Sequence, residues 1–122
     1  MRNFKEFFES IKDKSKNEKG IEFEKYCLEY LIQVKHEDAY RYEDYAKNID
    51  KTLPSEDCGV DIIIKKGGNT FQIVPCKFKG DKKPVSVKAL GTTFTFKFKY
   101  RDRIINPLIV MCTSEKKSKI FR

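Results

Sequence analysis

Two apolar runs joined by a glycine turn constrain the fold of this chain most strongly. Residues 59–65 and 70–79 are rich in β-branched and aromatic residues, and the turn Lys66-Gly67-Gly68-Asn69 between them is typical of a β-hairpin. The first run carries Asp61 near its start, and Lys77 lies near the end of the second. We therefore expect two consecutive strands that deliver a carboxylate and an ammonium group side by side. Such a pair can hold a cation next to the charge that develops on a phosphate.

The chain before the hairpin predicts two amphipathic helices. Apolar residues recur at helical spacing over residues 4–11 and again over 21–35, and a charged stretch over 12–19 separates the two runs. Glu24 borders the apolar stripe of the second helix, which is an unusual place for a carboxylate. It is either a site residue or a partly exposed glutamate favoured by the helix dipole. After this helix we expect an edge strand over residues 39–42.

The chain after the hairpin gives two conflicting patterns. Residues 80–84 predict a basic loop, and Ser86 is a suitable N-cap for a following helix. Apolar spacing from residue 87 onward fits that helix, but over 94–100 aromatic residues alternate strictly with threonine and lysine, which locally favours a strand. A buried-type strand is expected over residues 108–112.

Charge is divided unevenly between the two halves of the chain. Residues 1–61 hold 11 lysines and arginines against 15 acidic residues, whereas residues 62–122 hold 15 against 3. Net charges of −4 and +12 favour a polyanionic partner for the second half, and nucleic acid is the commonest polyanion inside cells. A solubilising surface and an anionic membrane are the alternatives, but the basic residues do not form one face of an amphipathic helix. The cations predicted to contact DNA are Lys65, Lys66, Lys79, Lys82, Lys83, Lys88, Lys97, Lys99, Arg101 and Arg103.

Length and composition predict one intracellular domain. A chain of 122 residues suits a single hydrophobic core, and no apolar run approaches the roughly 20 residues of a membrane span. The N-terminus lacks the apolar region and cleavage site of a secretory signal. We therefore expect a cytoplasmic protein, or a nuclear one in a eukaryote, with no membrane partner. The four cysteines stand singly, without the spacing of a zinc ribbon or a redox dithiol.

Four short motifs occur in an order that resembles a known superfamily. They are residues 20–24 on the second helix, 57–61 entering the first hairpin strand, 76–79 ending the second, and 110–114 on the last strand. This order resembles the restriction-endonuclease-like, or PD-(D/E)xK, superfamily, and within it the Mrr-type domains. The resemblance covers about residues 20–114 and implies an α/β fold with a mixed central sheet flanked by helices. In a single domain of residues 1–122, residues 1–19 would add an N-terminal helix and 115–122 a basic tail.

The resemblance also implies a role for each matching residue. Asp61 would be the metal-binding carboxylate, and Lys77 would orient the attacking water or stabilise charge on the scissile phosphate. Glu24 would complete the metal site through water, and the backbone carbonyl of Cys76 would be a further oxygen ligand. The cation would be Mg²⁺ or Mn²⁺, and the reaction would be endonucleolytic hydrolysis of DNA.

Further expectations follow from the same resemblance. It implies a helix from about Ser86, which we adopt for residues 86–93 while 94–100 stays open between helix and strand. Mrr-type domains occur alone or at the start of helicases and restriction enzymes, so an attached or separate helicase or restriction subunit is an expected partner. Many nucleases of this type act as dimers to cut both strands, which makes a homodimer a further expectation.

Pro75 departs from the family pattern. This position usually carries Glu, or Gln in Mrr-like domains, and gives an oxygen ligand to a hard cation. Proline offers no side-chain oxygen and lacks the N–H of a central strand. Gln72 would face the opposite side of a regular strand unless a bulge re-aimed it.

Two hypotheses about function therefore stay open. One is an active Mg²⁺-dependent endonuclease, and the other is a nuclease-derived DNA-binding module whose catalysis was lost at Pro75. A third, an unrelated basic interaction domain, would not bring Glu24, Asp61 and Lys77 together.

Overall fold

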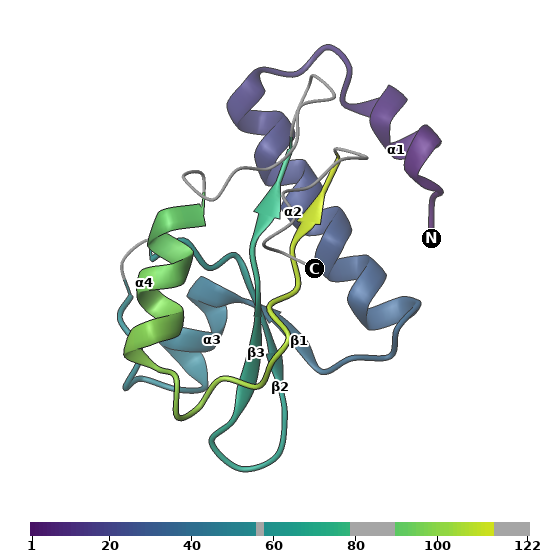
Figure 1. Cartoon of the computed structure of the whole chain (residues 1–122). Helices are drawn as coiled ribbons and strands as arrows, with labels where there is room; N and C mark the ends of the chain where they lie inside the picture. Colours follow the sequence, from purple (N-terminus) through teal and green to yellow (C-terminus); the bar gives the residue numbers. More distant parts are fainter. Residues whose placement is uncertain (56–57, 79–89, 114–122) are drawn as a thin grey trace.

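The structure is a computed structural model that describes residues 1–55, 58–78 and 90–113 (Figure 1). Its centre is a three-stranded antiparallel sheet in the order β1-β2-β3, formed by Ala39–Arg41, Ile62–Lys65 and Phe71–Val74. The hairpin and the edge strand predicted from the sequence are therefore confirmed. All of β3 and the first three residues of β2 are buried, so both faces of the sheet must be covered by other elements.

Helix α2 (Lys16–Gln33) covers one face of the sheet, and α1 (Phe4–Ser10) packs beside it through contacts of Phe7 with Phe23 and Tyr26. The cluster that they form with it consists of Phe7, Ile11, Phe23, Cys27, Leu31, Ala39, Ile62, Ile64 and Val74. Helix α2 begins earlier than the predicted residue 21 because Ser15 accepts a hydrogen bond from the backbone N–H of Glu18 and donates one to its carboxylate. This reciprocal capping turns part of the charged stretch into the first turn of a helix.

Helices α3 (Tyr42–Asn48) and α4 (Gly91–Lys99) lie on the other face. Their cluster with the sheet consists of Tyr42, Tyr45, Ala46, Leu53, Val60, Ile63, Phe71, Ile73 and Phe96. The strand interpretation of residues 94–100 is wrong, since this segment lies in α4 and its C-cap. Phe96 is buried whereas Phe98 is 70% exposed, so the alternating phenylalanines do not share a face. The predicted loop over 80–84, the Ser86 cap and the tail over 115–122 lie outside the described residues.

The predicted strand over 70–79 is interrupted at Pro75. Before the break β3 pairs with β2, and after it β4 (Cys76–Lys77) pairs in parallel with β5 (Met111–Cys112), which makes the β structure mixed. The carbonyl of Pro75 accepts a hydrogen bond from the N–H of Met111 at 3.0 Å. Proline has no N–H to donate in return, so the parallel pairing with the last strand does not extend to the residues before Met111. The predicted strand over 108–112 is accordingly reduced to two residues, and the one over 59–65 begins at Ile62.

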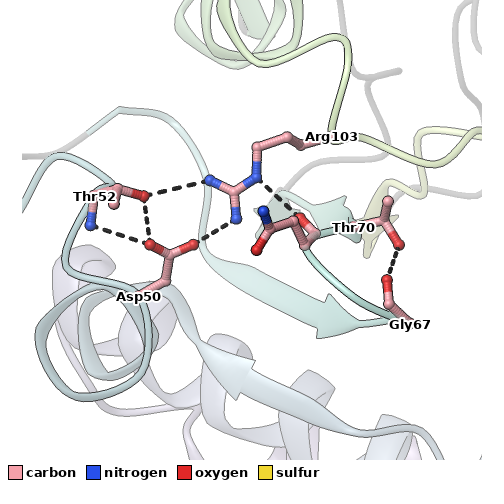
Figure 2. Close-up of polar contacts among 6 residues, drawn as sticks. Asp50, Thr52, Gly67, Thr70 and Arg103 are labelled. Carbon is pink, nitrogen blue, oxygen red and sulfur yellow. Dashed lines mark hydrogen bonds and ion pairs between the residues drawn. The ribbon is translucent and has the colours of Figure 1, made fainter.

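Arg103 joins three loops at the hairpin end of the sheet (Figure 2). Its guanidinium donates to Asp50 after α3, to the Thr52 hydroxyl at 3.4 Å and to the Asn69 carbonyl in the hairpin turn at 2.9 Å. It also lies 5.1 Å from the centre of the Phe71 ring. Burial alone would raise the pKa of the Asp50 carboxyl, but hydrogen bonds from Thr52 and Arg103 together hold that pKa below its usual value.

Replacing Arg103 with glutamine is expected to lower the free energy of unfolding by about 2 to 3 kcal/mol, because a mostly buried carboxylate loses its charged partner. Urea unfolding at neutral pH measures this loss. The folded-state pKa of Asp50 is depressed, so the stabilisation exists above the unfolded pKa and disappears as pH falls through the folded one. The difference between the two proteins should therefore shrink in acid. Arg101→Gln is the control, since Arg101 is exposed, and a loss as large in that variant would contradict the prediction.

Within the described ranges, no helix is both long and apolar enough to cross a bilayer.

Candidate active site

Asp61 lies directly before β2, at the end of the sheet where Pro75 interrupts the neighbouring strand. Its backbone carbonyl accepts a hydrogen bond from the N–H of Tyr42 at 2.8 Å, which fixes the chain at the junction of β1 and α3. Its carboxylate oxygen Oδ2 accepts a hydrogen bond from the backbone N–H of Cys76 at 2.7 Å. The carboxylate is therefore held against the first residue after the proline.

Glu24 approaches Asp61 from helix α2. The residue follows buried Phe23 on the side of the helix that faces the sheet, and its side chain is only 20% exposed. Burial raises the pKa of the Glu24 carboxyl, the nearby charge of Asp61 raises it further, and a hydrogen bond from Arg41 opposes both effects. The Nε atom of Arg41 lies 3.2 Å from Glu24 Oε1. The structure thus brings together two carboxylates from parts of the chain that are far apart in sequence.

Two pockets meet at this pair of carboxylates. One, of about 530 Å³, is lined by Lys16, Asn17, Gly20, Ile21, Glu24, Asp61 and Cys76. The other, of about 240 Å³, is lined by Glu24, Arg41, Tyr42, Glu43, Ser55, Val60 and Asp61. Glu24 and Asp61 line both pockets, so solvent and a ligand can reach the pair from two sides.

Cys76 contributes its backbone to the site. The carbonyls of Pro75 and Lys77 accept hydrogen bonds from the N–H groups of Met111 and Thr113, so both point toward β5. In a strand, the N–H and C=O groups of one residue point to the same edge, and those of the next residue point to the opposite edge. The Cys76 carbonyl therefore points away from β5, to the edge where the Cys76 N–H donates to Asp61. A hydrogen bond with Cys27 and, to a lesser extent, burial raise the pKa of the Cys76 thiol.

Lys77 lies beside this group but on the other face of its strand. Cys76 and Phe78 both pack against the cluster that contains α2, so the side chain of Lys77 between them points to the opposite face of β4. It is half-buried and does not line either of the two pockets that Glu24 and Asp61 share. Of the three predicted catalytic residues, Glu24 and Asp61 come together, and Lys77 adjoins them through the backbone of Cys76.

The side chains of Pro75 and Gln72 place no further oxygen ligand beside Glu24 and Asp61. The side chain of Pro75 is fully buried. The amide nitrogen of Gln72 lies 3.3 Å from the carbonyl oxygen of Pro107, to which it donates a hydrogen bond. The strand break therefore does not turn Gln72 toward Asp61.

The predicted DNA-contacting cations differ in their surroundings. Lys65, Lys99 and Arg101 are exposed, and Lys97 is half-buried on α4. Lys66 pairs with Glu37 at 3.2 Å, and Arg103 pairs with Asp50, so both have acidic partners within the chain. The remaining predicted contacts, Lys79, Lys82, Lys83 and Lys88, lie outside the described residues. A role in DNA binding remains a prediction for all ten.

Sequence reasoning missed Arg41, which the structure places against Glu24. A signal for it was present, because Ala39 and Arg41 alternate on the edge strand and must share a face. Ala39 belongs to the cluster beneath α2, so the side chain of Arg41, on the same face of the strand, also lies toward that helix.

The donors around Asp61 suit a hard cation. Across the described residues, no three or more His, Cys, Asp or Glu side chains are grouped closely enough to hold a metal ion. Two carboxylates and a backbone carbonyl nevertheless form an all-oxygen set, and Mg²⁺ needs only one or two carboxylates because it keeps several waters. Asp61, Glu24 and the Cys76 carbonyl therefore fit Mg²⁺ or Mn²⁺ in chemistry.

Comparison with known proteins found a matching family. A family model of Mrr type, described as a restriction endonuclease, matches residues 28–120. Comparisons with curated proteins and with solved structures found no match. The matched range includes Asp61, Pro75 and Lys77, whereas Glu24 precedes it. The helices and the mixed β structure are consistent with an α/β restriction-endonuclease-like fold, and the matched family is one of DNA-cleaving enzymes. The chain belongs to the Mrr-type restriction endonuclease family.

Proposed function

We propose that the chain is a Mg²⁺-dependent endonuclease domain that hydrolyses phosphodiester bonds of DNA at Asp61, Glu24 and Lys77. The observation that carries the proposal is the 2.7 Å hydrogen bond from the Cys76 N–H to the Asp61 carboxylate. It joins the start of β2 to the end of the interrupted strand, so that Asp61 and the Cys76 carbonyl lie at one edge with Glu24 beside them. In an unrelated basic domain, Asp61, Glu24 and the Cys76 backbone would not be expected to lie together.

Each residue has a distinct task in this proposal. Asp61, Glu24 and the Cys76 carbonyl would hold Mg²⁺ or Mn²⁺, which when bound supplies charge stabilisation and lowers the pKa of water. The ammonium group of Lys77 would offset negative charge on the phosphate or orient the attacking water. Glu24 would take its part in holding the cation through a water molecule, to which its half-buried carboxylate would accept a hydrogen bond.

DNA would be held by the exposed cations of the second half of the chain. Lys65, Lys99 and Arg101 are available among the described residues. Phosphate contacts release counterions, so affinity should fall steeply as salt rises. A homodimer would let two copies of the site cut the two strands.

A second candidate function is favoured by Pro75. Its buried ring occupies the position that normally gives an oxygen ligand, so the site has one donor fewer than the family pattern. In this case the domain binds DNA without cutting it and serves an attached or separate helicase or restriction subunit. The two candidates differ in whether the remaining donors suffice for catalysis.

Supercoiled plasmid nicking in Mg²⁺ and in Mn²⁺ separates the two candidates. The parent chain is expected to nick, and Lys77→Ala is expected to slow nicking by about 10² to 10³-fold, the loss typical of one transition-state contact. Lys47→Ala is the matched control, an exposed lysine on α3 that should leave the rate unchanged.

Pro75→Gln tests the cost of the missing ligand. It should raise the nicking rate or lower the Mg²⁺ concentration required, because it restores an oxygen donor. If a folded, DNA-binding parent chain fails to nick in either metal and Pro75→Gln does nick, the impaired module is the correct function. Cleavage that is unaffected by Lys77→Ala would contradict the proposed site.

A further inference from the structure

Arg41 connects the helix carboxylate of the site to the sheet. Its Nε atom lies 3.2 Å from Glu24 Oε1, and its Nη1 atom lies 3.4 Å from Glu43 Oε1. The side chains of Arg41 and Glu24 are 27% and 20% exposed, whereas that of Glu43 is 68% exposed. The contact with Glu24 is therefore the better shielded of the two, and charge-assisted hydrogen bonds gain strength as water is removed.

The position of Arg41 is fixed by the β-ladder next to Asp61. Arg41 is the register partner of Ile62, the residue after Asp61, and the following N–H, of Tyr42, donates to the Asp61 carbonyl at 2.8 Å. Arg41 also lines the pocket of about 240 Å³ together with Glu24 and Asp61. One hydrogen-bonded segment of backbone therefore carries the Arg41 side chain and holds the Asp61 carbonyl.

Glu24 needs such a partner to stay where it is. Its carboxylate lines the same two pockets as that of Asp61, and two negative charges brought this close repel each other. A glutamate side chain has considerable rotamer freedom, and two pockets beside Glu24 give it room to turn away. The planar guanidinium of Arg41 opposes both the repulsion and the rotation by binding one carboxylate oxygen in a defined direction.

We propose that Arg41 is a positioning residue of the DNA-cleaving site. It holds Glu24 toward Asp61, so that position 24 presents a second acidic group at a site where Pro75 supplies none. The inference rests on the proposed nuclease function, and it assigns Arg41 a role through Glu24 with no contact of its own to the scissile phosphate.

A double-mutant cycle tests this role, with nicking rates measured for the parent chain, Arg41→Met, Glu24→Gln and the double variant. Methionine keeps an unbranched apolar stem at position 41. Arg41→Met should slow nicking by about 10- to 100-fold, the usual effect of losing the partner of a metal ligand, and leave DNA affinity within about twofold. The double variant should be no slower than Glu24→Gln alone. Arg41→Lys should recover part of the rate, and Asp44→Asn, at an exposed carboxylate of α3, should leave it unchanged.

Each other outcome overturns the proposal. Effects that multiply in the double variant mean that Arg41 does not act through Glu24. A loss of DNA affinity equal to the loss of rate makes Arg41 a phosphate contact. Thermal unfolding of all four proteins checks that the rates compare folded states.

Mn²⁺ binding, measured by isothermal titration without DNA, decides the matter if the parent chain does not nick. Loss of a positive charge alone would tighten cation binding, so weaker binding by Arg41→Met reports lost positioning of Glu24. The weakening should vanish when glutamine already replaces Glu24. Unchanged or tighter binding overturns the positioning role. Absence of nicking together with the expected binding result overturns the proposed activity and leaves the role of Arg41 intact.

Discussion

Replacing Asp61 with asparagine is expected to reduce metal-dependent nicking of DNA by at least about 10³-fold. Asparagine keeps an oxygen that can accept the hydrogen bond from the Cys76 N–H, so the break between β3 and β4 should keep its geometry. What it removes is the negative charge on which cation binding depends, and a bound metal ion contributes several kcal/mol of transition-state stabilisation. Single-turnover nicking at saturating protein, in Mg²⁺ and in Mn²⁺, measures the effect.

Two comparisons make this result interpretable. Asp44→Asn removes an exposed carboxylate from α3 and should leave the rate unchanged, which controls for the change in net charge. Asp61→Ala removes both the charge and the hydrogen-bond acceptor, so it should also reduce stability. A rate for Asp61→Asn within about tenfold of the parent chain is too small a loss for a metal-binding carboxylate and would place the cation elsewhere.

Replacing Gly59 with alanine is expected to give the largest loss of stability, about 3 kcal/mol or more. Gly59 has a φ of +78°, which costs an L-residue about 1 to 2 kcal/mol. A Cβ atom there would also lie 2.8 Å from the Thr93 backbone nitrogen and 2.8 Å from the Thr92 Cβ. The steric contact adds to the cost of the positive φ, because the backbone at the start of α4 cannot move aside as a flexible side chain can. Urea unfolding measures the change, and Gly59 lies two residues before Asp61, so nicking should fall as well.

Two other glycines separate the two contributions. Gly68 has a φ of +62° with no atom within 4 Å of the position of a Cβ, so Gly68→Ala should cost only the conformational part, about 1 kcal/mol. Gly67 has open space and no positive φ, so Gly67→Ala should be nearly neutral. If Gly59→Ala costs no more than Gly68→Ala, the close contact between Gly59 and α4 does not exist in solution.

The sequence predicted the elements that rest on local signals. The glycine turn and the isoleucine run identified the hairpin, and helical spacing identified α1 and most of α2. The sequence also contains the Ser15 cap residue and the spacing of Tyr42 and Tyr45 on α3, but the charged residues around them made both helical signals weak. The phenylalanine alternation favoured a strand at α4 because the burial of one side chain depends on tertiary packing, which places Phe96 in the core and Phe98 in solvent.

The site was predictable in part for the same reason. Asp61 and Glu24 were identified from motifs, and the structure brings them together. The partner of Glu24 was not identified, because the contact with Arg41 spans 17 positions and depends on how α2 crosses the sheet. Charge alone also could not show that Lys66 and Arg103 have acidic partners within the fold, since pairing depends on distance in space.

Mn²⁺ titration followed by the broadening of backbone amide NMR signals most directly tests whether Asp61 and Glu24 form a metal site. Paramagnetic broadening falls steeply with distance from the ion, so it locates the ion without requiring cleavage. Broadening is predicted to begin at Asp61, Cys76 and the segment of α2 around Glu24, and to disappear in Asp61→Asn. Broadening that begins instead around Asp50, or that spreads evenly over the acidic residues, would contradict a metal-dependent nuclease site at the end of β2.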